Sequence, residues 1–380
     1  MNLQLTEDQR MIQDSVRRFV EAEVKPRAAD LDERCAFPWE AVKGLAKLGM
    51  MGMATDPELG GAGLDTVSAS IVIEEVARHD GSLALTLASH NGLCSGHIRQ
   101  AGSEAQKKKW LPSLATAEKL GAWGLTEPGS GSDAAGMRTT AVKKGDRWVL
   151  NGSKIFITQG TVGEVFVILA STDKEKKTHG ISAFILEKGM KGFSQRAIHG
   201  KLGMRASDTA ELHFEDVEVP EENLLGKLNH GFIDTLKVLD RGRIAIGALG
   251  VGIARGCLEE SRAYALDRAQ FGKPIAEFQA IQWMLADMAT ETDAARLLVR
   301  RAADLADRGQ PFGTEASMGK LFASEAAVRA GMKAIQIHGG YGYTREFPVE
   351  RYLRDAKLLE IGEGTSEVQR MVIARRVLGG

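Results

Sequence analysis

A single carboxylate close to the C-terminus is the first candidate for catalytic chemistry. Glu363 stands between Gly362 and Gly364 in the stretch LLEIGEGTSEVQR, just before residues with helical periodicity. Flanking glycines give the backbone freedom to aim the carboxylate, and a glutamate in an apolar pocket can act as a general base because burial raises its pKa. The same residues also fit a surface turn before a helix that starts near Ser366, with Gln369 completing the cap. Taken alone, the stretch favours the turn.

A second candidate is the segment WGLTEPGSGSD, residues 123–133, which crowds threonine, serine and glycine where helical periodicity gives way to strand-like alternation. Backbone amides in such a segment can converge on a ligand rich in hydrogen-bond acceptors. Runs of proline, glycine and serine are equally common in connecting turns. Residue chemistry alone leaves a ligand loop and a plain connection equally open.

Several familiar catalytic patterns do not occur in the sequence. EPGSGSDAAG is not GxGxxG, no strand–helix–strand alternation surrounds it, and GxxxxGK[ST], HExxH and GxSxG are missing. His90 and His97 could share one helix face, but a structural role is favoured over a metal pair. Three scattered cysteines, Cys35, Cys94 and Cys257, support neither a disulfide framework nor a zinc knuckle. We expect no metal site and a reducing compartment.

Composition limits the partners that the chain can attract. The 380 residues carry 49 basic and 50 acidic side chains, a net charge of −1, so no overall electrostatic attraction to nucleic acid or to an anionic membrane is expected. The amphipathic start resembles no signal peptide, no run reaches the ~20 apolar residues of a membrane span, and VLGG is no targeting signal. We expect a cytoplasmic protein, although a matured protein of the mitochondrial matrix would look the same.

The elements that must position these candidates fall into three parts, which together predict an α+β fold. Helical spacing of apolar residues dominates 1–118, short alternating runs rich in β-branched residues dominate 119–228, and helical spacing returns over 229–380. The pair Asn151 and Gly152 matches the residues of a tight hairpin turn. We predict a helical domain, an antiparallel β domain and a second helical domain, in this order.

Five glycines weaken the helix expected around GRIAIGALGVGIARG, by about 1 kcal/mol each relative to alanine. Close backbone packing is the expected compensation, either against other helices of the chain or between subunits. The glycines are Gly242, Gly247, Gly250, Gly252 and Gly256.

Five separated motifs then give the chain a family resemblance. LTEPGSGSD, FITQG, DRAQFGK, QIHGGYGYTREFPVERYLRDAK and IGEGTSEVQR, in this order and spacing, resemble the acyl-CoA dehydrogenase flavoproteins over essentially the whole length. The resemblance implies an N-terminal helical domain, a middle β domain and a C-terminal four-helix bundle. It also implies FAD as cofactor, an acyl-CoA substrate, a homotetramer built as a dimer of dimers, and electron-transfer flavoprotein as the electron acceptor.

The resemblance assigns FAD contacts to matching positions. Leu125 and Thr126 would contact the pyrimidine side of the flavin, Phe156 would pack on the isoalloxazine ring, and Thr158 would hydrogen-bond near N5. Two further FAD contacts follow the glutamate, at Thr365 and Glu367. A last group would reach the FAD of a neighbouring subunit: Arg268, Gln270, Phe271, Gln336, Gly339 and Gly340.

The resemblance also assigns the reaction and its substrate contacts. Glu363 would abstract the pro-R α-proton of a saturated acyl-CoA while the β-hydrogen leaves as hydride to flavin N5, giving the trans-2-enoyl thioester. The backbone N–H of Glu363 and a ribityl hydroxyl would stabilise the enolate-like oxygen. Ser132 would face the thioester, Asp240 and Arg243 would bind the pantetheine and adenine portions of CoA, and Gly364 would also contact substrate.

Departures within the family narrow the substrate class. Some members carry the base at the position of Gly242, where glycine cannot serve, so Glu363 is the expected base and the isovaleryl and long-chain types are disfavoured, although SHNGLCSGHIRQAGSEAQKKKWLP resembles the isovaleryl branch. Many straight-chain members have tyrosine at the position of Gly362, and its loss would widen the pocket. GSLALTLASHNG has no arginine for a dicarboxylic substrate. Short to medium acyl chains are expected, beside apolar walls from Leu83, Leu85, Leu87 and Ala88.

Two alternatives keep the fold but change the function. An acyl-CoA oxidase would pass electrons to O₂, although such oxidases are usually longer than this chain. A non-catalytic scaffold member would retain FAD as a structural element, but it would have no need of the carboxylate of Glu363.

Overall fold

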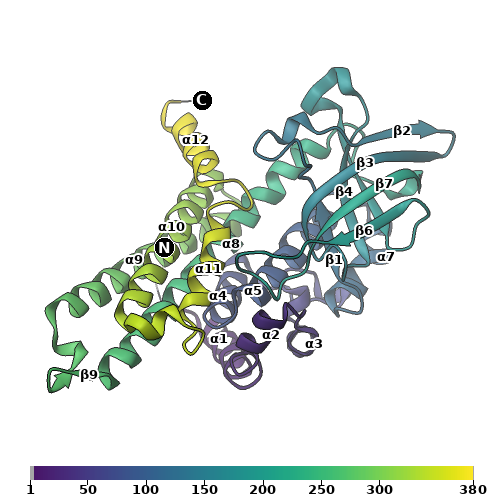
Figure 1. The fold of residues 1–380 in the computed structure, drawn as a ribbon. Coiled ribbons are helices and arrows are strands. Elements are labelled where there is room, and N and C mark those ends of the chain that lie inside the picture. The colour runs from purple at the N-terminus through teal and green to yellow at the C-terminus, as the bar shows by residue number, and fades with distance from the viewer. Residues whose placement is uncertain (1–3, 380) are drawn as a thin grey trace.

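The computed structural model describes residues 4–379 and arranges them as helices, a sheet and helices again. Figure 1 shows the sheet at one end of the molecule and the long C-terminal helices at the other, with the N-terminal helices between and below them. The expected α+β order is therefore confirmed. The expected boundaries after residues 118 and 228 fall in the connections that enter and leave the sheet.

Seven α-helices form the N-terminal part. A capping box starts helix α1. The Thr6 hydroxyl accepts the backbone N–H of Gln9, and the Gln9 side-chain oxygen accepts the backbone N–H of Thr6. The helices are α1 (Glu7–Phe19), α2 (Ala28–Arg34), α3 (Trp39–Lys47), α4 (Thr66–Ala77), α5 (Gly81–Ala88), α6 (Ser95–Ala101) and α7 (Glu104–Ala115).

The middle part is one sheet in the order β6-β7-β3-β2-β4-β5-β8, and β1 is added beside β4. Most neighbouring strands are antiparallel, but β1 runs parallel to β4, and β2 meets β4 in a parallel sense at one residue pair. The strands are β1 (Gly121–Gly124), β2 (Thr140–Lys144), β3 (Arg147–Thr158), β4 (Val165–Ser171), β5 (Ile181–Glu187), β6 (Phe193–Ala197), β7 (Thr209–Pro220) and β8 (Leu224–Leu225).

The hairpin predicted at Asn151 and Gly152 was wrong. Both residues lie inside β3, where the pairing with β7 shifts register between Leu150 and Gly152. A β-bulge and a turn both favour small residues with unusual backbone angles, so the dipeptide alone could not distinguish them. The turn between β2 and β3 instead contains Gly145, whose φ is +63°.

The C-terminal part is built around three long helices, with α10 packed against α8, α9, α11 and α12. A two-stranded hairpin of β9 (Ala269–Gln270) and β10 (Lys273–Pro274) joins the first two helices and lies at the tip of the bundle farthest from the sheet (Figure 1). The helices are α8 (Gly231–Asp267), α9 (Gln279–Asp307), α10 (Gly313–His338), α11 (Val349–Leu359) and α12 (Ser366–Val377). No helix in residues 4–379 combines the length and the apolar character needed to cross a bilayer.

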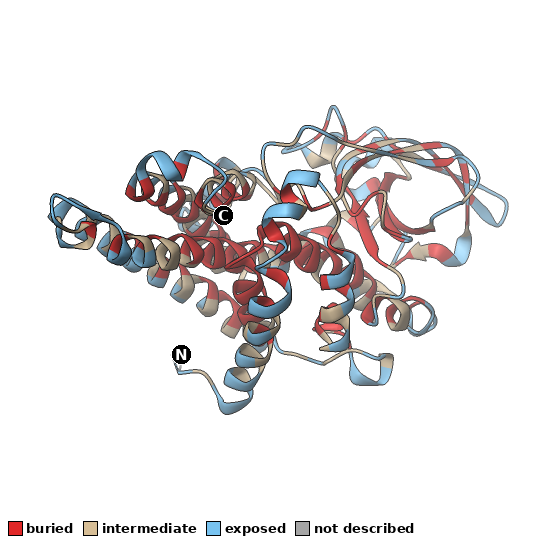
Figure 2. Cartoon of the chain, turned by 60° about the horizontal axis from the view of Figure 1, so that its bottom comes forward, coloured by how far each residue is buried: buried red, intermediate tan, exposed pale blue. Residues whose placement is uncertain are grey.

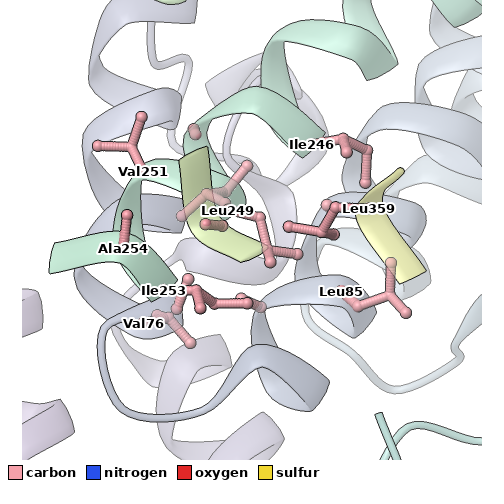
Figure 3. Close-up of a cluster of buried hydrophobic side chains, with 14 of the residues drawn as sticks. Val76, Leu85, Ile246, Leu249, Val251, Ile253, Ala254 and Leu359 are labelled. Carbon is pink, nitrogen blue, oxygen red and sulfur yellow. The ribbon is translucent and has the colours of Figure 1, made fainter. Parts of the chain in front are cut away.

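Helix α8 packs closely on both sides through its glycines. A Cβ at Gly250 would lie 2.9 Å from the backbone oxygen of Ala323 on α10, and one at Gly252 would lie 2.5 Å from the backbone oxygen of Glu74 on α4. These contacts are within one protomer, so packing inside the chain is sufficient to account for the glycines. Figure 2 shows the resulting buried centre, and Figure 3 shows α8 side chains such as Leu249 packed there with Val76 and Leu359.

Buried charges join the N-terminal helices to the bundle. Glu75 on α4 has no exposed surface and accepts hydrogen bonds from Arg17 on α1 and Arg255 on α8, at 2.9 and 2.7 Å. Its neighbour Glu74 binds Arg296 on α9 at 3.0 Å. Burial alone would raise the pKa of Glu75, but the two guanidinium groups hold it below its usual value. The network therefore ties four helices together through ionised groups.

We predict that Glu75→Ala lowers the free energy of unfolding by about 3 kcal/mol or more, because it leaves the largely buried guanidinium group of Arg255, and the partly exposed one of Arg17, without their carboxylate. Urea unfolding at one fixed subunit concentration measures the effect. The matched control is Asp30→Ala, which removes an exposed pair with Arg34 and should cost less than about 1 kcal/mol. Equal losses in the two variants would contradict a structural role for the network.

Candidate active site

Glu363 lies in a short connection between α11 and α12 with an unusual backbone. Its φ is +50° and that of Gly364 is +91°, so two consecutive residues adopt the left-handed region. The connection ends at Thr365, whose hydroxyl accepts the N–H of Val368 and caps α12. The cap predicted at Ser366 was therefore one residue too late. A non-glycine residue held at positive φ costs free energy and points to a functional constraint.

Two side chains from outside the connection hold its carbonyl groups. The Nζ atom of Lys320 on α10 donates to the Gly364 oxygen at 2.7 Å, and Nε2 of Gln369 donates to the same oxygen at 2.9 Å. Gln369 also reaches the Glu363 oxygen at 3.3 Å. Lys320 and Gln369 have no exposed surface. The backbone of the predicted base is thus fixed from two helices, and the sequence analysis had identified neither residue as an anchor of this turn.

The carboxylate of Glu363 points at Gly242 on α8. A Cβ at Gly242 would overlap Oε2 of Glu363 and would lie 3.5 Å from Cδ2 of Leu93. Oε2 is buried and has no hydrogen-bond partner among the described residues. Burial raises the pKa of Glu363 to about 7, and the positive charges of Lys320 and Arg243 oppose that rise. A carboxylate with a free oxygen and a pKa near neutral has the properties of a general base.

Arg243, which is predicted to bind CoA together with Asp240, lies near this carboxylate. Nη1 of Arg243 contacts Oδ1 of Asp240 at 2.5 Å and donates to Oγ of Ser317 at 3.3 Å. The Arg243 guanidinium is buried, whereas Asp240 is partly exposed. Burial raises the pKa of Asp240, and the nearby Arg243 charge opposes the rise. The structure thus brings Arg243 close to Glu363 and pairs Asp240 with that arginine, and the contacts of both residues with CoA stay a prediction.

The loop that begins with Leu125 and carries the motif LTEPGSGSD, called the LTEP loop below, is held by a buried ion pair that the sequence analysis missed. Nζ of Lys154 on β3 lies 2.8 Å from Glu127 and donates to the Leu125 oxygen at 2.9 Å. Glu127 also accepts the backbone N–H groups of Arg138 and Thr139, at 2.6 and 3.0 Å. Burial lowers the pKa of Lys154 to about 8, while the Glu127 charge opposes this. One side-chain pair therefore holds both ends of the loop.

The residues predicted to contact the flavin lie on neighbouring segments. The N–H of Ile155 donates to the Thr126 oxygen at 2.9 Å, so Leu125 and Thr126 run beside the end of β3 that carries Phe156 and Thr158. Phe156 has a φ of +59° and is 64% exposed, so a large apolar ring faces outward. Such a surface beside threonine hydroxyls fits an apolar ring system with polar edges.

Apolar packing connects this segment to the base. Leu93, whose side chain lies near the Gly242 position, belongs to the same buried cluster as Leu125. Ser132 is exposed in the LTEP loop, and Glu367 is exposed on the first turn of α12. The predicted contacts of these two residues stay predictions.

The remaining predicted FAD residues lie at the opposite end of the protomer. Arg268 lies at the start of the hairpin that Figure 1 shows far from the sheet, and its guanidinium stacks over the Tyr341 ring at 5.7 Å. Phe271 is 93% exposed, and no carboxylate of residues 4–379 forms an ion pair with Arg268. The group at this end contains Arg268, Gln270, Phe271, Gln336, Gly339 and Gly340. One protomer therefore does not bring the two predicted sets of FAD contacts together.

Each of the two sets of predicted FAD contacts has side chains that suit one part of FAD. The outward Phe156 ring and nearby hydroxyls fit a flavin ring, and an exposed guanidinium without an acidic partner fits a diphosphate. Within the described residues, no group of three or more histidine, cysteine, aspartate or glutamate side chains is arranged to hold a metal ion.

Family models match nearly the whole chain. The acyl-CoA dehydrogenase N-terminal domain matches residues 6–118, the middle domain matches 122–217 and the C-terminal domain matches 229–378. The chain belongs to the acyl-CoA dehydrogenase family. The family resemblance and the three-part fold predicted from the motifs are confirmed, and the protein is an acyl-CoA dehydrogenase-type oxidoreductase.

Relatives of known name extend over the full length of this acyl-CoA dehydrogenase. The short-chain specific acyl-CoA dehydrogenase of Clostridium acetobutylicum is 49% identical and covers 99% of this chain and 100% of its own. Butyryl-CoA dehydrogenase from Megasphaera elsdenii has a TM-score of 0.97 at 42% identity, with both chains covered completely. A chain solved in work on the electron transferring flavoprotein of Acidaminococcus fermentans has a TM-score of 0.98 at 46% identity, again over both whole chains.

Members of the acyl-CoA dehydrogenase family bind FAD. A glutaryl-CoA dehydrogenase from Mycobacterium smegmatis, solved in complex with FADH2, is 34% identical, covers 99% of this chain and 96% of its own, and has a TM-score of 0.94. In this chain the LTEP loop and the end of β3, which carry the predicted flavin contacts, lie side by side.

We predict that Glu363→Gln stabilises the protein more at pH 8 than at pH 5, by about 2 kcal/mol. Glu363 has a folded pKa of about 7 and an ordinary value of 4.5, so the folded protein binds more protons between these pH values. The wild-type protein therefore loses stability as pH rises through this window, whereas glutamine does not titrate. Urea unfolding of both proteins at the two pH values measures the difference. A difference that does not change with pH would contradict the buried state of the carboxylate.

Proposed function

We propose that the protein catalyses the FAD-dependent α,β-dehydrogenation of a short-chain acyl-CoA to the trans-2-enoyl-CoA, with Glu363 as the base. The observation that carries the proposal is the unpartnered, buried Oε2 of Glu363 directed at the space above Gly242. A carboxylate kept only for structure would use its oxygens in hydrogen bonds. Here one oxygen stays free to accept a proton from a substrate.

Residues of the chain can be assigned to each step that the protein itself must perform. Glu363 takes the α-proton, and Lys320 and Gln369 keep its backbone in place while it does so. The backbone N–H of Glu363 would donate to the thioester oxygen, which gains negative charge as the proton leaves. Bound FAD supplies the acceptor for the hydrogen that leaves the β-carbon. Leu125 and Phe156 would pack on the bound flavin and exclude water from that side of it.

The separation of the two FAD contact sets supports a homo-oligomer. If the residues at the bundle tip reach the FAD of a neighbouring subunit, each site is completed by two chains, and we propose the homotetramer built as a dimer of dimers. The exposed apolar side chains near that tip, among them Phe271, Leu266 and Trp283, suit burial in an interface.

Short acyl chains are the proposed substrates, with butyryl-CoA as the first to test. This follows the specificity stated for the relatives from Clostridium acetobutylicum and Megasphaera elsdenii. Gly362 supports some tolerance for branching, because a Cβ there would meet nothing closer than 3.6 Å. The position therefore has room for a side chain that glycine leaves open to substrate. Leu83 and Leu87 are fully buried, while Leu85 keeps 8% exposure, and their role as tail-pocket walls stays a prediction.

Electron-transfer flavoprotein is the proposed electron acceptor. Support comes from the close match to a chain solved in work on such a flavoprotein and from the family to which the chain belongs. The cytoplasmic location expected from the sequence stays a prediction.

We predict that Glu363→Gln abolishes anaerobic bleaching of the flavin by butyryl-CoA, slowing it at least about 1,000-fold, because the general base is lost. Stopped-flow absorbance measures the rate, and the variant should still bind FAD and CoA thioester. The matched control is Glu360→Gln in the same connection, a residue whose partly buried carboxylate pairs with Lys357. This control should bleach at close to the wild-type rate.

Other outcomes identify the alternatives. Normal bleaching by Glu363→Gln would remove Glu363 from the mechanism. Failure of the wild-type holoenzyme to bleach with linear, branched, aromatic or dicarboxylic acyl-CoAs would favour a scaffold that only retains FAD. Rapid oxygen consumption with acyl-CoA, undiminished without electron-transfer flavoprotein, would favour an oxidase.

A further inference from the structure

A lysine with no exposed surface lies beside the proposed base. Lys320 is on α10, which α8 approaches closely at Gly247, since a Cβ at Gly247 would lie 3.5 Å from the backbone nitrogen of Lys320. Its Nζ donates to the Gly364 oxygen at 2.7 Å, and no carboxylate of residues 4–379 lies within ion-pair distance of it. A buried ammonium group that is not in an ion pair is unusual and calls for an explanation.

We propose that Lys320 is a positioning residue for the base: its ammonium group anchors the Gly364 carbonyl and supplies the positive charge that keeps Glu363 ionisable beside the substrate. This inference rests on the proposed function, because it assigns Lys320 a role in the same proton transfer. The geometry supports it, since the anchored carbonyl belongs to the residue immediately after the base. Gln369 holds the same carbonyl but carries no charge, so the two anchors differ in what they add.

The charged groups around Lys320 come from three other elements and the turn itself. Arg243 on α8 is the second cation facing Glu363, and it is already paired with Asp240 at 2.5 Å. Two further carboxylates act on Lys320, one at the end of α11 and one on α12, namely Glu360 and Glu367.

Most of these groups are balanced by partners of their own. Glu360 is paired with Lys357, and Glu367 is exposed to solvent. Arg370 and Glu325 form a further pair between α12 and α10, farther out on the surface. Lys320 is therefore the cation near the base whose charge no adjacent ion pair offsets. Burial lowers the pKa of Lys320 to about 8, so the group is mainly cationic at neutral pH.

The experiment compares flavin reduction by butyryl-CoA across pH in the wild-type holoenzyme, Lys320→Met and Lys320→Arg. Methionine keeps the approximate volume of lysine but removes its positive charge and its hydrogen-bond donor. Arginine keeps the charge and the donor. In Lys320→Met the acid limb of the rate profile should move up by about one pH unit, so that the rate near pH 6 falls roughly tenfold. Lys320→Arg should keep the wild-type midpoint. Lys143→Met on β2, which removes an exposed lysine paired with Glu221, is the surface control.

A second readout does not depend on turnover. Urea midpoints are measured near pH 7.5 for Lys320→Met in the wild-type and in the Glu363→Gln background. Coupled charges predict a smaller loss of midpoint in the Glu363→Gln background than in the wild type. If wild-type enzyme fails to reduce its flavin, the proposed function fails, and this cycle still decides whether Lys320 acts on Glu363.

The outcomes are distinct. A lower rate at every pH with an unchanged midpoint, together with additive urea midpoints, would make Lys320 a purely structural residue and overturn the inference. If Lys320→Met does not retain FAD, Lys320→Gln, which keeps a donor without the charge, should show the same upward shift. If Lys320→Arg is the one variant that gives a folded holoenzyme, or if no Lys320 variant does, Lys320 acts in folding and the inference is likewise overturned.

Discussion

The close approach of α8 to its neighbours is the constraint on which the rest of the structure depends. Glycines occupy three positions along this helix where a side chain would collide with the end of α4, with α10 or with Glu363. Gly256 faces the backbone of Arg78, Gly250 faces that of Ala323, and Gly242 faces the carboxylate of Glu363. Because backbone then packs on backbone, the helices keep a fixed spacing, and the catalytic turn enters a space whose size α8 has already set.

A free carboxylate inside this space requires an electrostatic balance. Water is excluded from Oε2 of Glu363, which disfavours its charge, while Lys320 and Arg243 favour it. The balance brings the pKa close to neutral, where both the ionised base and its protonated form are accessible during turnover. Buried charge is handled differently on the far side of α8, where Glu75 has full hydrogen-bonding partners and serves only to join helices. The contrast separates the carboxylate that we propose as the base from a structural one.

Much of this arrangement could be predicted from the sequence, and the failures have physical causes. Helical and strand periodicity predicted the three parts correctly, and the motif around Glu363, once the family was recognised, singled out the residue that we propose as the base. The two lysine anchors, Lys320 and Lys154, were missed because they come from elements distant in the sequence. Lys320 has only one sequence signal, a lysine on the small-residue face of a helix, and Lys154 has only an inward position within an apolar strand. The bulge at Gly152 was mistaken for a turn because both use the same dipeptide.

The central claim is that Glu363 is a buried carboxyl group whose ionisation occurs near neutral pH. Infrared difference spectra of wild-type protein minus Glu363→Gln, recorded as pH is raised, isolate the carbonyl stretch of this one protonated carboxyl group. The account predicts that the band disappears with a midpoint near pH 7. Disappearance near the ordinary glutamate pKa of 4.5 would contradict it, because the carboxylate would then be solvated and would not have the environment of the base.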